Sequence, residues 1–131
     1  MNKERSTRFS AKIVNVKMSV HPHAWHPPTD VFETEEEFIV RIEIAGMQED
    51  DFTVSLDGSK VSVMGKRLLK NRKCAYHRME IPYGEFRTSV DLPGEINSSE
   101  ASADYENGFL TIHAPKQKPK NVRITTEEGT K

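Results

Sequence analysis

The chain has 131 residues, of which 35% are hydrophobic and 30% charged, and its formal net charge is −1. This length suits one domain with a core of its own, and there is no apolar run of about 18 residues that would predict a membrane-spanning helix. The N-terminus is charged and lacks the apolar segment of a signal peptide, and Cys74 is the single cysteine. We therefore expect a cytoplasmic protein without an internal disulfide.

The charges are grouped along the chain. Residues 1–28 contain five Lys/Arg and one Glu, residues 30–57 contain ten Asp/Glu and one Arg, and residues 60–73 contain six Lys/Arg and no acid. Blocks of opposite charge attract each other within a chain or between copies. This pattern favours self-association over binding to one highly charged partner.

Short segments of alternating apolar and polar residues follow one another from residue 30 onward, and none has a convincing helical period. Turn signals separate them at Asp57-Gly58, Pro93-Gly94 and Asn107-Gly108. The pattern predicts an all-β fold, an antiparallel β-sandwich of the immunoglobulin-like type. The six strands that we expect span residues 38–44, 52–57, 61–65, 86–92, 101–105 and 109–114.

We expect the sandwich domain to span residues 29–115. Three segments do not fit a bare sandwich: the two terminal segments and one long loop within the domain. In the N-terminal arm, residues 1–28, apolar residues alternate from Val14 to Val20 and can form an extra strand. The 17-residue stretch from Leu68 to Gly84 is longer than ordinary loops, and residues 76–81 within it can form a strand that pairs with the sheet edge of another molecule. In the polar C-terminal tail, residues 116–131, Val122 and Ile124 would point to one side of an extended segment.

Five short motifs, in order and with fitting spacing, resemble the small heat-shock protein family, which is built on the α-crystallin domain. The resemblance covers about residues 28–124, most of the chain. Its most specific part is Ala103-x-Tyr105-x-Asn107-Gly108-x-Leu110-Thr111-Ile112. The other four are Pro28 to Thr34, Ile44 to Val54 around Ala45-Gly46, Val61 to Arg67 with its Gly-x-Arg ending, and Tyr83 to Phe86 with Leu92-Pro93 further on.

The resemblance implies the roles of several segments. Val122 and Ile124 match a tail motif that docks in a groove on a neighbouring dimer, with about 1.5–3 kcal/mol from each buried side chain before ordering costs. The long loop implies the bacterial and plant subtype, in which a loop strand swaps onto the partner subunit near residues 30–34. The expected groove residues are Phe52, Val54, Leu56, Ala101 and Ala103, and the expected swap strand is Tyr76, His77, Arg78, Met79 and Glu80.

The implied function is an ATP-independent chaperone, a holdase that binds unfolding client proteins and assembles as a homodimer and higher oligomer. The residues that we expect to contact clients lie in the arm: Phe9, Ile13, Val14, Val16, Met18 and Trp25. For Trp25, packing on the sandwich is an equal alternative. The rival function is an adaptor or co-chaperone sandwich that binds one folded partner, and monomeric behaviour would favour it.

The sequence gives only weak support for catalysis or for binding of a metal, a cofactor, nucleic acid or a membrane. Cys74 and His77 lack a fixed orienting acid, so we expect no catalysis. The histidines at 21, 23 and 26 have no cysteine or acid cluster beside them, and we expect a solvated arm with no metal. The glycines stand singly, without a nucleotide-binding pattern, so we expect no cofactor. The basic run 60–73 has one nearby aromatic residue, and we expect neither nucleic acid nor membrane as partner.

Overall fold

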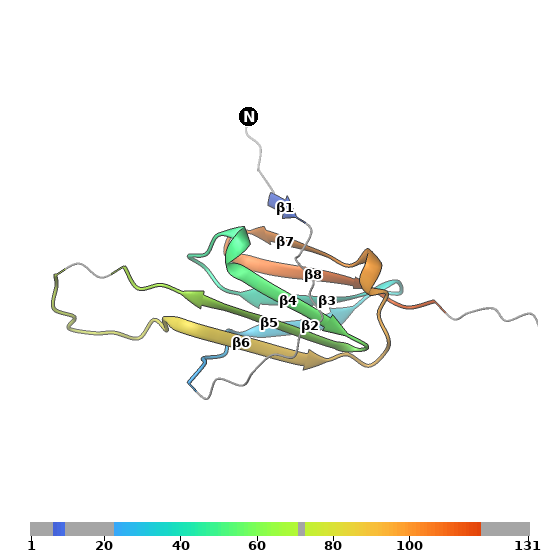
Figure 1. Ribbon diagram of the computed structural model, residues 1–131, viewed down its shortest axis with the longest axis horizontal. Helices are drawn as coiled ribbons and strands as arrows, with labels where there is room; N and C mark the ends of the chain where they lie inside the picture. Colours follow the sequence, from blue (N-terminus) through green and yellow to red (C-terminus); the bar gives the residue numbers. More distant parts are fainter. Residues whose placement is uncertain (1–6, 10–22, 71–72, 119–131) are drawn as a thin grey trace, which may run out of the picture.

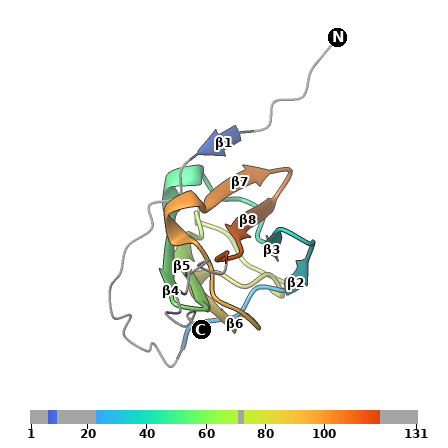
Figure 2. The ribbon, with the colours of Figure 1, turned by 90° about the vertical axis from the view of Figure 1, so that its right-hand side faces the viewer.

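The computed structural model describes residues 7–9, 23–70 and 73–118. Its strands form two antiparallel sheets packed face to face (Figures 1 and 2), which confirms the predicted β-sandwich. Two short 3-10 turns, η1 (Glu49–Asp51) and η2 (Ser98–Glu100), interrupt the strands. The strands are β1 (Thr7–Phe9), β2 (Thr29–Glu33), β3 (Glu37–Glu43), β4 (Phe52–Asp57), β5 (Lys60–Arg67), β6 (Gly84–Asp91), β7 (Ser102–Glu106) and β8 (Phe109–Pro115).

The larger sheet has the strand order β1-β7-β8-β3-β2, and the smaller one has the order β4-β5-β6. β1 and β2 are therefore the edges of the larger sheet, and β4 and β6 are the edges of the smaller one. All six strands that alternation predicted are present, within one to two residues at most ends. β2 matches the first strand that the family resemblance implied.

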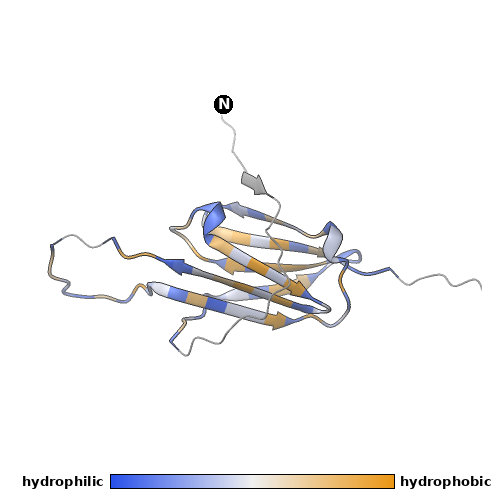
Figure 3. Ribbon diagram, viewed as in Figure 1, coloured by the Kyte–Doolittle hydropathy of each residue, from blue (hydrophilic) through white to orange (hydrophobic). Residues whose placement is uncertain are grey.

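The core lies between the sheets, because strands β3 to β8 turn apolar residues inward. In β3 these positions are Phe38, Val40 and Ile42, and Ile42 is fully buried. Apolar and polar residues alternate along β4 and β5 in Figure 3. Rings from both sheets meet near one end, where the Phe52 and Tyr105 centroids are 5.1 Å apart. Burial of such alternating positions is the main source of stability for a sandwich of this kind.

The β7–β8 hairpin is made by Asn107 and Gly108, which have φ values of 54° and 82°. A two-residue turn with both φ values positive matches the twist of the flanking strands, so the turn fixes the β7–β8 register. Next to it, the Tyr105 hydroxyl donates to the Ile44 carbonyl at 2.7 Å and accepts from the Met47 N–H at 3.3 Å. These bonds tie the hairpin to the turn that follows β3.

The structure adds one strand outside the expected six, because β1 was not expected and it pairs with β7. Residues 76–81 form no strand in the single chain. The strand expected there pairs with another molecule, whose sheet edge a single chain does not supply, so it stays a prediction. The strand expected between Val14 and Val20 lies outside the described residues. Within the described ranges, no helix has the length and apolar character needed to cross a bilayer.

Candidate self-assembly and client-binding surfaces

Loop 68–83 joins β5 to β6 and extends away from one end of the sandwich (Figure 1). The expected swap residues, Tyr76 to Glu80, all lie on it and are all exposed. Four large apolar side chains of the loop face solvent: Leu68, Tyr76, Met79 and Ile81 are 51–63% exposed. An exposed apolar group of this size on a projecting segment is typical of a surface that another protein covers.

β2 is an edge strand with an apolar surface of its own. It pairs with β3 on one side, and its other side has no strand neighbour among the described residues. Val31 and Phe32 are 43% and 41% exposed. Natural proteins usually protect such an edge, because its unpaired N–H and C=O groups accept a further strand. β2 therefore has the hydrogen-bonding groups and the apolar side chains that an added strand needs.

The expected groove residues lie where β4 and β7 meet across the sandwich, and the structure brings them into one cluster. They are more buried than a groove lining requires. Ala101 is partly buried, whereas the other four are at most 7% exposed: Phe52, Val54, Leu56 and Ala103. They belong to the core, so a docking tail would have to contact the margin of this cluster. Tail docking stays a prediction.

β1 limits access to the margin of the expected groove residues, because it occupies the side of β7 that faces away from β8. The register places Thr7 opposite Tyr105 and Phe9 opposite Ala103. A segment that docked by pairing with β7 would have to take the place of β1. Of the other residues expected to contact clients, those from Ile13 to Met18 lie outside the described residues.

Trp25 packs on the sandwich, which is the second of its two expected positions. The backbone N–H of Trp25 donates to the Glu85 carbonyl at 3.0 Å, and the backbone carbonyl of Trp25 accepts from the Arg87 N–H at 2.9 Å. Its ring is partly buried, with its centroid 5.6 Å from that of Phe86. The described part of the arm thus reaches β6 before residue 29, and in this position Trp25 is only partly accessible to a client.

The start of the C-terminal tail is held at the opposite end of the molecule from loop 68–83 (Figure 1). The Lys116 N–H donates to the Glu36 carbonyl at 2.9 Å, and the Gln117 N–H donates to the Glu95 carbonyl at 3.0 Å. Val122 and Ile124 lie outside the described residues. The described part of the tail therefore ends at the end of the sandwich where β8 finishes.

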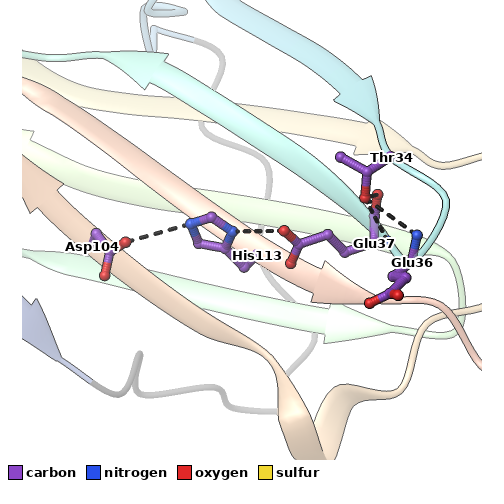
Figure 4. Close-up of polar contacts among 5 residues, drawn as sticks. All are labelled: Thr34, Glu36, Glu37, Asp104 and His113. Carbon is purple, nitrogen blue, oxygen red and sulfur yellow. Dashed lines mark hydrogen bonds and ion pairs between the residues drawn. The ribbon is translucent and has the colours of Figure 1, made fainter.

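Sequence reasoning missed a polar cluster on the outer face of the larger sheet (Figure 4). The His113 Nδ1 lies 3.2 Å from the Glu37 Oε2, and its Nε2 lies 3.4 Å from the Asp104 Oδ2. The three side chains come from β8, β3 and β7, so the cluster ties three neighbouring strands. In the turn between β2 and β3, the Thr34 hydroxyl accepts from the N–H groups of Glu36 and Glu37. Glu37 is far from His113 in sequence and Asp104 lies across the β7–β8 hairpin, so no local motif indicates that the three meet.

The residues weighed for catalysis lie on loop 68–83, and those weighed for metal binding belong to the N-terminal arm. Cys74 and His77 are both exposed on loop 68–83. His26 Nδ1 lies 2.6 Å from the Arg87 carbonyl, and His23 is exposed. No three His, Cys, Asp or Glu side chains are grouped for a metal ion in the described part of the chain. His21 lies outside that part.

The fold and the exposed surfaces define a class: an immunoglobulin-like β-sandwich in which an edge strand and a long loop carry exposed apolar side chains. Residues 30–126 match the Hsp20/alpha crystallin family. Because this match covers most of the chain, the protein belongs to the Hsp20/alpha crystallin family.

Named relatives agree with this assignment. Small heat shock protein C2 of Rickettsia felis is 31% identical over 105 residues, which cover 79% of this chain and 68% of that protein. Spore protein SP21 of Stigmatella aurantiaca is 33% identical over 110 residues, and the match covers 80% of this chain but 65% of that protein. This chain thus spans about two thirds of the length of these relatives.

Solved structures give the same result for the fold. The hspA from Xanthomonas axonopodis is 26% identical with a TM-score of 0.66, covering 71% of this chain and 95% of that one. Heat shock protein 16.0 from Schizosaccharomyces pombe is 25% identical with a TM-score of 0.64, covering 76% of this chain and 98% of that one. The sandwich described above is the α-crystallin domain.

Proposed function

We propose that this protein is an ATP-independent molecular chaperone, a cytoplasmic holdase that binds unfolding proteins and prevents their aggregation without catalysing a reaction. One observation carries the proposal: loop 68–83 and the β2 edge together expose six large apolar side chains on an α-crystallin domain. Surfaces of this kind bind a second copy or an exposed apolar segment of another protein. The names of the relatives, which are heat shock proteins, support the same role.

The proposed building block is a strand-swapped homodimer. Residues 76–80 of one subunit would pair with β2 of the other, where they would gain the hydrogen bonds that they lack in the single chain. The charges are complementary in part, because the loop contains Lys73 and Arg78 and β2 contains Asp30 and Glu33. Arg78 also pairs with Glu80, and Glu33 with Lys116, whereas Lys73 and Asp30 make no such ion pair within the described part of the chain. Val122 and Ile124 would then link dimers by contacting the margin of the expected groove residues, where β4 and β7 meet. These contacts are individually weak, so heat would release them and expose apolar surface to clients.

The test is suppression of aggregation. A heat-labile protein is warmed with increasing amounts of this chaperone, with and without ATP, and turbidity is followed. We expect suppression at near-stoichiometric ratios that ATP does not change. An unrelated β-sandwich protein of similar size is the control. If turbidity develops as it does with the control, the holdase proposal fails. A monomeric mass by light scattering would in addition favour the rival function, an adaptor that binds one folded partner.

A further inference from the structure

Arg67 is the last residue of β5 and stands at the point where loop 68–83 begins. Its Nε and Nη2 donate to the Pro82 carbonyl, near the other end of the loop, at 3.1 and 2.6 Å. Its Nη1 donates to the Ala45 carbonyl at 3.0 Å, in the turn that follows β3. One guanidinium thus joins the two ends of the loop and fastens both to the sandwich.

The same guanidinium lies against two aromatic rings. Its Cζ is 4.7 Å from the ring centroid of Trp25 and 5.4 Å from that of Tyr83. Both distances are within the range of cation–π attraction. The Trp25 Nε1 in turn donates to the Gly84 carbonyl at 3.3 Å, one residue after Tyr83. Trp25 belongs to the N-terminal arm and Tyr83 to the loop, so Arg67 is the contact through which these two segments meet.

A lysine could not make this arrangement. The planar guanidinium donates along several directions in its plane while its faces remain available to aromatic rings, whereas an ammonium group is a compact point charge. The stem of Arg67 also passes Gly46, where an added Cβ would lie 3.7 Å from the Arg67 Cδ. The residues around Arg67 therefore hold it in one position.

We propose that Arg67, Trp25 and Tyr83 form a clasp that couples attachment of the N-terminal arm to the position of loop 68–83, and thereby regulates exchange of the loop between subunits. This rests on the strand-swapped dimer proposed above. When Trp25 leaves, the guanidinium loses one of its ring contacts and its hold on Pro82 and Tyr83 weakens. Coupling of this kind is reciprocal, so a loop that swaps out of position also loosens the arm. Arg67 acts as a positioning residue.

The first readout is the fluorescence of Trp25, the only tryptophan of the chain. We compare Arg67→Ala and Arg67→Lys with Lys66→Ala, which removes one positive charge from the exposed neighbouring position. Both Arg67 variants should shift the emission to longer wavelength, because the ring becomes more solvated, and Lys66→Ala should not. Far-UV circular dichroism checks that each variant is folded. Tyr83→Leu leaves Arg67 and its backbone bonds in place and should give a smaller shift.

The second readout is exchange of subunits between labelled and unlabelled dimers, followed by native mass spectrometry. We expect Arg67→Ala to exchange at least about tenfold faster, because it removes three charge-assisted hydrogen bonds and the loss of one alone corresponds to about that factor. Trp25→Leu, although it changes the arm, should also accelerate exchange. In the double variant the two effects should be less than additive, because both act through one clasp. If Arg67 only stabilised the fold, its effect on exchange would add to that of Trp25→Leu.

Specific outcomes overturn the clasp. Unchanged Trp25 emission in Arg67→Ala would show that the guanidinium does not hold the ring. Additive effects, or normal exchange in Trp25→Leu, would show that arm and loop are independent. If the unmodified chain is a monomer, the swapped dimer fails on its own. Amide hydrogen exchange of residues 73–84 in Trp25→Leu then tests the coupling without a dimer, with unchanged protection overturning it.

Discussion

Gly65 lies where two backbones and a ring come closest together. A Cβ added there would lie 2.6 Å from the Phe86 Cζ and 2.7 Å from the Asp51 carbonyl oxygen. We predict that Gly65→Ala lowers the free energy of unfolding by about 1–3 kcal/mol, because overpacking forces neighbouring groups apart. Urea denaturation measures the change. In a Phe86→Leu background the penalty should shrink without vanishing, since the Asp51 carbonyl remains. Wild-type stability of Gly65→Ala would contradict the close approach.

His113 gives a second prediction at the residue scale. Its imidazole and the Glu37 carboxylate are each about 30% exposed, so solvent screens their attraction. A double-mutant cycle with His113→Ala and Glu37→Gln should therefore give a coupling of only about 0.2–1 kcal/mol. Urea unfolding of the four proteins provides the measurement. Arg78 and Glu80, a much more exposed pair on loop 68–83, serve as the control and should show less coupling. Strictly additive changes at His113 and Glu37 would show that the contact contributes nothing.

β1 leads to a prediction at the scale of elements. It pairs with β7 over three residues, with Arg8 opposite Asp104. Arg8→Pro removes one N–H and fixes φ, which disfavours the pairing. We expect the β7 amides that face β1 to exchange hydrogen faster, while amides of β5 keep their protection. Arg8→Ala, which leaves the backbone intact, is the control. Unchanged protection along β7 would show that β1 does not cover that edge in solution.

The strands could be predicted from the sequence to the extent that they alternate. Apolar residues recur at alternate positions along β3 to β8, so this pattern predicts the strands, whereas β1 has three residues and is defined by its partner β7. The same alternation could not distinguish a core strand from a groove wall. Phe52, Val54 and Leu56 have the spacing of a lining but are nearly fully buried. The contacts of Arg67 could not be predicted from the sequence, because Trp25, Ala45 and Tyr83 come together only in the folded chain.

At the scale of the whole molecule, loop 68–83 and the first residues of the tail lie at opposite ends of the sandwich (Figure 1). Loop 68–83 lies before the start of β6, and Lys116 and Gln117 are bonded at the end where β8 finishes. A subunit built this way can hold its dimer partner with one end and a neighbouring dimer with the other. The two contacts then do not compete for one surface, so each should be removable without the other.

This separation gives the last prediction. Val122→Ala/Ile124→Ala should reduce oligomers to dimers, because the tail loses its apolar contacts while β2 and the loop are unchanged. Val31→Lys should reduce dimers to monomers, since it places a positive charge on the β2 edge opposite the basic loop, and Val31 is exposed enough for the fold to tolerate it. Val31→Glu is the matched control and should disrupt the dimer less. Light scattering measures each mass. If the tail variant gave monomers, or Val31→Lys left dimers intact, the tail and the β2 edge would not have the separate roles proposed for them.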